Sequence, residues 1–173
     1  MTGGGIVISE TGDYAGLVAF FIGNGLEFSA EDEVSTDIVK SWKAVEVSAG
    51  TGDEPGPGRL VCGADGCGAG SGAGRLVGGC VLAKREGRFI CDGIATDPSV
   101  RGMRIGERLL SVMTDAARAL GAAELYLVAR APGFFAKNGF EPVPRDGAPT
   151  FFECFSCPQY GNGCNPEVMR LNL

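Results

Sequence analysis

Hydrophobic residues recur along the chain with two different periods, which predict a mixture of strands and helices. Helical spacing of apolar residues predicts helices over 13–25, ended by Gly25, and over 102–120, ended by Gly121. In the longer helix one face carries Ile105, Leu109, Met113, Ala116 and Leu120. Short apolar or alternating runs predict strands over 6–8, 41–47, 124–130, 140–143 and 150–155. Two shorter helices are predicted, over 29–39 and 132–138.

The most distinct strand signal is a pair of runs over 75–85 and 88–96, separated by Glu86 and Gly87. Two strand-like runs joined by a tight glycine turn predict a β-hairpin. The order of elements is therefore mixed α and β, and we expect a single domain over 1–173. Residues 49–74 are rich in glycine and predict an insertion, and residues 150–173 form a C-terminal segment that contains cysteines.

Composition and charge exclude several functional classes. The chain has 173 residues and a formal net charge of −6, so no overall positive field attracts nucleic acid or anionic lipid. No apolar run approaches the roughly 18 residues that span a bilayer. Histidine is absent, which excludes Ser-His and Cys-His nucleophile pairs and histidine-containing zinc sites. We expect no nucleic-acid or membrane partner, and a cytoplasmic protein whose seven cysteines are thiols or ligands. Whether two copies form a homodimer stays open.

One segment has the features of a phosphate site. The predicted strand that ends at Thr96 runs through Gly102 directly into the long helix, so several backbone N–H groups and a positive helix end converge there. Many helices begin in this way without a ligand, so the pattern alone leaves both alternatives open.

The motif ATDPSVRGMRIGERLL resembles the acetyl-CoA pyrophosphate loop of the GNAT superfamily of N-acetyltransferases. Arg101 and Gly106 match that pattern, and Arg104 replaces its middle glycine. The resemblance implies that the pyrophosphate of acetyl-CoA binds along Arg101, Gly102, Met103, Arg104, Ile105 and Gly106. It also implies that the pantetheine arm pairs like an added strand with Ile94, Ala95 and Thr96.

A second motif, PGFFAKNGF over 132–140, resembles the short helix and following strand of the same family. In much of the superfamily the second aromatic is a tyrosine that protonates the departing thiolate. Phe135 stands there in this chain and has no proton to give. The Phe-Phe pair, together with the tail around Cys154, Cys157 and Cys164, resembles the short N-acetylglutamate-synthase-like branch.

The resemblance implies an α/β (α+β) fold with a mixed, mostly antiparallel sheet, flanked by helices and splayed at the acetyl-CoA site. It implies direct acetyl transfer from acetyl-CoA to a small primary amine, with amino acids and first of all L-glutamate as acceptors. A protein N-acetyltransferase and a non-catalytic CoA-binding sensor are the alternatives.

Asp92 is the candidate base. On a regular strand it shares a face with Ile90 and Ile94, where desolvation would raise the pKa of its carboxyl toward that of a useful base. Alternatively, that face is solvated, or Asp92 forms a structural ion pair with Arg88 or Lys84. Water activated by backbone carbonyls is a further candidate for the base.

Arg88 and Arg130, at predicted strand ends, are candidates for binding the carboxylates of an amino-acid acceptor, although either could be plain surface charge. Cys80 and Cys91 lie on adjacent hairpin strands and are expected to be buried. Cys154, Cys157 and Cys164 have a spacing that could hold zinc if Cys62, Cys67 or Glu153 completed the set. Otherwise this turn packs without metal.

Overall fold

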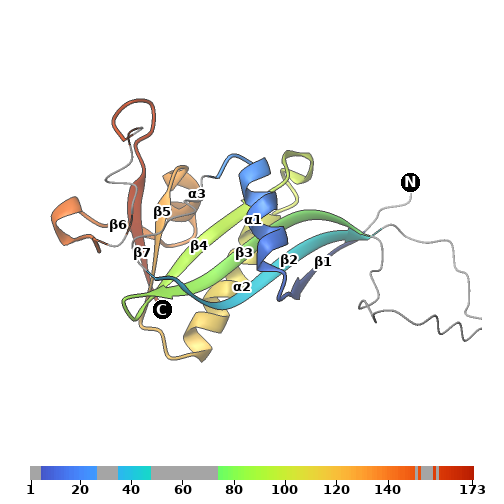
Figure 1. The fold of residues 1–173 in the computed structure, drawn as a ribbon, viewed down its shortest axis with the longest axis horizontal. Helices are drawn as coiled ribbons and strands as arrows, with labels where there is room; N and C mark the ends of the chain where they lie inside the picture. The colour runs from blue at the N-terminus through green and yellow to red at the C-terminus, as the bar shows by residue number, and fades with distance from the viewer. Residues whose placement is uncertain (1–4, 27–34, 48–73, 151, 153–157, 159) are drawn as a thin grey trace, which may run out of the picture.

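The computed structural model describes residues 5–26, 35–47, 74–150, 152, 158 and 160–173, and these form a sheet with helices on both faces (Figure 1). The strands are β1 (Gly5–Glu10), β2 (Asp37–Val47), β3 (Arg75–Arg85), β4 (Arg88–Thr96), β5 (Glu124–Ala129), β6 (Glu141–Pro142) and β7 (Glu167–Asn172). The helices are α1 (Tyr14–Gly23), α2 (Ile105–Ala119) and α3 (Pro132–Lys137), with short 3₁₀ turns at Pro98–Val100 (η1) and Arg145–Gly147 (η2).

The sheet has the strand order β1-β2-β3-β4-β5-β7-β6, and its pairs are antiparallel except for β4 with β5. The predicted mixed, mostly antiparallel sheet is therefore confirmed. The helices α1 and α2 cover opposite faces of β3. Leu17 of α1 lies against Gly79, and Leu109 of α2 lies against Gly78 and accepts a bond from the Cys80 thiol.

The predicted hairpin of β3 and β4 is confirmed at both ends. Arg85 pairs with Arg88 across the turn, and Glu86 and Gly87 both have positive φ, at 48° and 77°. Two positive φ values in a two-residue loop match the right-handed twist of the flanking strands. The hairpin therefore follows from local sequence.

The long helix supplies most of the core on one face of the sheet. Ile105, Leu109 and Met113 are buried as predicted, but Leu120 is 48% exposed, and Ala117 is buried whereas the predicted Ala116 is only partly buried. The reason is that the helix ends at Ala119, so Leu120 follows its last turn, while Ala117 lies on the buried face four residues after Met113.

One predicted element needs correction, and one strand is found that the sequence analysis does not predict. Residues 37–39 belong to strand β2 rather than to the predicted helix over 29–39, because Ile38 pairs with Ala83 of β3. The remaining part of that prediction, residues 29–34, lies outside the described residues. The pattern gave no sign of β7, which fills the place between β5 and β6. Its residues Val168 and Met169 are adjacent and buried on opposite faces, so the strand shows no simple alternation.

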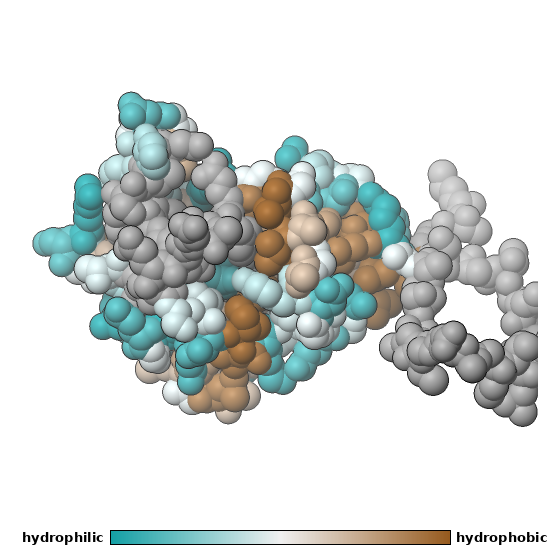
Figure 2. Space-filling view, in the orientation of Figure 1, coloured by the Kyte–Doolittle hydropathy of each residue, from teal (hydrophilic) through white to brown (hydrophobic). Residues whose placement is uncertain are grey.

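The glycine-rich residues 49–73 and most of the predicted strand over 150–155 also lie outside the described residues. Among the described helices, none has the length and apolar character needed to cross a membrane. Helix α1 is apolar over most of its length, and Figure 2 shows hydrophobic surface over it. Ile22 of this helix is 55% exposed.

Candidate functional site

The strands β4 and β5 diverge along their length. In the described residues they are paired at a single position, Ile90 with Tyr126, and Figure 1 shows β5 leaning away from β4 beyond it. We call the diverging part, from Asp92 to Thr96 on β4 and from Val128 to Arg130 on the β5 side, the fork. Strand pairing uses backbone N–H and C=O groups, so the fork leaves such groups on β4 for an extended ligand.

The chain leaves β4 through a turn that leads into α2. Gly102 has φ +85°, and Arg104 has φ +57°, a left-handed conformation that costs a residue with a side chain about 1–2 kcal/mol. This explains why the family pattern has glycine at the position of Arg104. The Arg104 guanidinium pairs with Glu107, at 2.7 Å from Nε to Oε2, so this cation is held at the first turn of α2.

Helix α2 begins at Ile105 and has no side-chain cap at its N-terminus. The first N–H groups of a helix lack intrahelical partners and carry the positive end of its dipole, which together attract an anion. Ile105 is buried, so its side chain points to the core and its N–H contributes to the turn. Met103 and Arg101 are exposed on the loop beside it. The N–H groups of Arg101 and Met103 donate within the turn, to the carbonyls of Pro98 and Val100, so an anion site over 101–106 would use the other N–H groups of this segment.

Gly106 lies in close contact with helix α3. A Cβ at this position would come within 3.3 Å of the Phe134 ring and 4.0 Å of Thr96. The small residue therefore allows the start of α2, the end of β4 and α3 to approach one another. Phe135, at the position of the family's tyrosine, is buried and packs edge to face on Phe134 and Phe140.

Asp92 lies at a β-bulge. Val81 pairs with Gly93 and Leu82 pairs with Cys91, so Asp92 is the extra residue. The bulge reverses the alternation after it: Ile90 packs in the cluster with Tyr126, whereas Ile94 packs on the α2 side of the sheet. The expectation that Ile90, Asp92 and Ile94 share one face is therefore wrong, because one inserted residue shifts the phase of a strand.

The Asp92 carboxylate is buried, with 6% of the side chain exposed. It accepts a hydrogen bond from the Tyr14 hydroxyl at 3.0 Å and forms an ion pair with Arg85 at 3.4 Å. The expected ion-pair partners, Arg88 and Lys84, are thus replaced by Arg85, which has 11% of its side chain exposed and also donates to Thr36. Sequence reasoning missed both Tyr14 and Arg85, because only the tertiary fold brings α1 and the end of β3 to the bulge.

The two candidate arginines lie far apart. Arg130 follows β5 at the fork and donates to the carbonyl of Gly25, just after α1. Arg88 lies at the other end of β4, where its guanidinium is over the Tyr126 ring. Arg88 precedes the paired Ile90 by two residues and Arg130 follows Tyr126 by four, which separates them by about 20 Å along the strands. They do not form one carboxylate site.

Cys80 and Cys91 are buried in the core, as expected. Burial raises the pKa of the Cys80 thiol to about 12 and that of Cys91 well above its ordinary value, with the charge of Asp92 adding to the shift of Cys91. Cys164 is a half-buried free thiol. Cys154 and Cys157 lie outside the described residues, so the predicted zinc set stays a prediction. Within the described residues no group of three metal-binding side chains occurs.

The raised pKa values give a direct chemical prediction. At pH 8, iodoacetamide is expected to leave Cys80 and Cys91 unmodified in the folded protein, because the reactive thiolate is almost absent and access is blocked. Mass spectrometry of peptides after denaturation with a second alkylating label checks this, with the half-buried Cys164 as the internal comparison. Modification of Cys80 or Cys91 at the rate of Cys164 would show that this core opens readily.

The acetyltransferase (GNAT) domain family matches residues 60–142, which include the hairpin, the turn and α2. The chain contains a GNAT acetyltransferase domain. Such a domain is that of an acetyl-CoA-dependent acetyltransferase. The resemblance implies that acetyl-CoA binds at the turn over 101–106 and at the fork, and these binding residues stay a prediction. A search of curated protein sequences gave no match.

Solved structures share the GNAT fold at low sequence identity. A GNAT-family acetyltransferase from Staphylococcus aureus has a TM-score of 0.62 and 17% identity, over 98% of this chain and 99% of that one. N-acetylglutamate synthase from Neisseria gonorrhoeae, complexed with coenzyme A and N-acetyl-glutamate, has a TM-score of 0.61 and 19% identity. The alignment covers 98% of this chain, which spans about a third (35%) of the synthase. An IAA acetyltransferase from Bacillus cereus has a TM-score of 0.54 and 16% identity, over 98% and 100%.

Proposed function

We propose that this GNAT domain acetylates the primary amine of a small amino acid, with L-glutamate as the first candidate. The observation that carries the proposal is the pair of opposite charges at the fork: the Asp92 carboxylate on β4 and the Arg130 guanidinium after β5. An amino acid is a zwitterion, so its ammonium and carboxylate complement these two groups. The fold shared with N-acetylglutamate synthase supports glutamate as the acceptor to test first.

In this proposal the backbone of 101–106 binds the pyrophosphate of acetyl-CoA, and the backbone of Ile94, Ala95 and Thr96 binds the pantetheine arm. Both roles use N–H and C=O groups, which side-chain substitutions leave in place. Held in this way, the thioester lies near the bulge at Asp92, and binding has removed most of the entropy cost of bringing it to the amine.

Asp92 accepts the proton of the acceptor's ammonium group. The free amine attacks the thioester carbonyl and the new C–N bond forms. The nitrogen then gives its second proton to water, the C–S bond breaks and the CoA thiolate leaves. The Arg85 guanidinium lies 3.4 Å from this carboxylate and holds it in place at the bulge. Since Phe135 replaces the family's tyrosine, the thiolate takes its proton from water.

Mass spectrometry of reaction products tests the acceptor. The protein is incubated with acetyl-CoA and L-glutamate, and in parallel with a pool of the other amino acids and with polyamines. We expect N-acetylglutamate at a rate well above every other product. Acetylation of polyamines alone would contradict an amino-acid acceptor.

Arg130→Gln is expected to raise the KM for the amino-acid acceptor about 10- to 100-fold, the loss of one charge-assisted hydrogen bond. The KM for acetyl-CoA should stay within twofold. Steady-state kinetics with each substrate varied in turn measures both. Arg88→Gln is the matched control, because it removes the same charge about 20 Å away. If Arg88→Gln raises the KM for the acceptor and Arg130→Gln does not, the carboxylate site lies at the opposite end of β4.

A further inference from the structure

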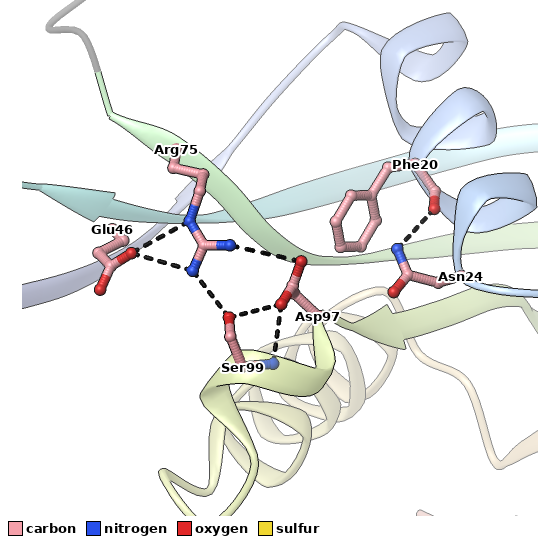
Figure 3. A network of polar contacts seen from close by, with 6 residues as sticks. All are labelled: Phe20, Asn24, Glu46, Arg75, Asp97 and Ser99. Carbon is pink, nitrogen blue, oxygen red and sulfur yellow. Dashed lines mark hydrogen bonds and ion pairs between the residues drawn. The ribbon is translucent and has the colours of Figure 1, made fainter.

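A polar network joins the strands β2 and β3 to the turn that precedes α2 (Figure 3). Arg75, the first residue of β3, donates through Nε and Nη2 to Oε2 of Glu46 on β2, at 3.2 and 3.1 Å. The same guanidinium donates through Nη2 to the Ser99 hydroxyl at 2.8 Å, and Nη1 lies 3.5 Å from the Asp97 carboxylate. We call Glu46, Arg75, Asp97 and Ser99 the Arg75 network.

The two residues that Arg75 contacts in the turn also hold each other. Asp97 accepts hydrogen bonds from the backbone N–H and the hydroxyl of Ser99. These bonds and the Arg75 cation lower the pKa of Asp97 below its ordinary value, so the carboxylate stays ionised throughout the neutral range. The turn continues through η1, where Val100 bonds to Asp97 and Met103 bonds to Val100, and then reaches Gly102 and α2.

The network fixes the turn to the sheet through the contacts of Arg75 with Asp97 and Ser99. Arg75 and Asp97 of the network line one side of an open cleft of about 520 Å³. Phe20 and Asn24 line the side of this cleft that is formed by α1. Figure 3 shows the Asn24 amide donating back to the carbonyl of Phe20 on its own helix. The turn is held to β3 by a backbone hydrogen bond from the Asp97 N–H to the Val77 carbonyl and by the buried Val100. Its side-chain polar contacts with β2 and β3 are made through Arg75.

We propose that Arg75 is a positioning residue for acetyl-CoA: it holds Asp97 and Ser99, and with them the turn that directs the N–H groups of Gly102 and 104–106 to one place. The inference rests on the proposed pyrophosphate site at this loop. Arg75 is half exposed, with 51% of its side chain accessible. Exposed ion pairs contribute little to global stability, so we expect its effect in the loop rather than in the unfolding transition.

The test is direct binding of coenzyme A by calorimetry, which needs no acceptor. Arg75→Gln is expected to weaken binding about tenfold, by loosening a charge-assisted network. The melting temperature should stay within about 2 °C of that of the parent protein. Arg118→Gln is the matched control, because Arg118 has a similar exposure and pairs with Asp115 on α2. It should leave the affinity within twofold.

A second variant separates positioning from simple charge. Coenzyme A is an anion, so removing the negative charge of Glu46 should strengthen its binding if Arg75 acts only through its charge or touches the ligand. If Arg75 must be held in place, Glu46→Gln weakens binding about three- to tenfold. Unchanged or stronger binding by Glu46→Gln would overturn the proposal.

A third variant tests the pyrophosphate site itself. Gly102→Ala places a side chain at φ +85° and should weaken binding whatever Arg75 does. If Gly102→Ala binds poorly while the Arg75 and Glu46 variants bind normally, the loop remains the site and the positioning role is wrong. Normal binding by Gly102→Ala would remove the pyrophosphate from the loop and this inference with it.

Discussion

Asp92→Asn is expected to lower kcat by about 10²- to 10⁴-fold, the usual contribution of a positioned general base. The amide has nearly the same shape and can still accept a hydrogen bond from Tyr14, but it cannot take a proton from the ammonium group. Coenzyme A affinity should be retained, because the proposed contacts to the cofactor are made by backbone groups. Steady-state kinetics and calorimetry on the same preparation measure the two quantities.

The control for this experiment is Asp115→Asn, which removes an exposed carboxylate from α2. It should have the kcat of the parent protein. If Asp92→Asn retains the kcat of the parent protein and only lowers the melting temperature, Asp92 is a structural residue that joins α1 to β4. Water then becomes the candidate base.

Arg85→Met is expected to destabilise the fold by about 3–5 kcal/mol, because it leaves the buried Asp92 carboxylate without its cation. Urea unfolding at neutral pH measures the loss. The exposed pair of Arg118 with Asp115 gives the comparison: Arg118→Met should cost at most about 1 kcal/mol.

The double variant Arg85→Met/Asp92→Asn shows whether the unpaired charge is the cause. It should recover a large part of the lost stability, since it removes the buried negative charge together with the cation that balances it. A loss below about 1 kcal/mol for Arg85→Met alone would show that water reaches Asp92 and that the site is open on this side.

The elements that the sequence predicted most accurately are those set by local chemistry. The β3–β4 hairpin depends on alternation and on a two-residue turn that accepts positive φ at Glu86 and Gly87. Helix α2 depends on apolar spacing and on a glycine stop at Gly121. The pyrophosphate-loop motif joins these two segments, and the second GNAT motif covers α3, so the fold could be inferred from local sequence.

The features that were missed depend on contacts between distant segments. The bulge at Asp92 is a property of the pairing between β3 and β4, and no pattern within β4 shows it. Arg85 and Tyr14 reach Asp92 from the far end of the hairpin and from α1. Arg75 meets Asp97 and Ser99 only after β3 has paired. A single sequence indicates the residue types of this site more readily than their partners.

A crystal structure with coenzyme A bound tests the central claim most directly. The account predicts the pyrophosphate on the N–H groups of 101–106, the pantetheine arm along Ile94 to Thr96 in the fork, and the thiol close to the bulge at Asp92. Coenzyme A bound elsewhere, or with its thiol on the far side of the sheet from Asp92, would contradict the account.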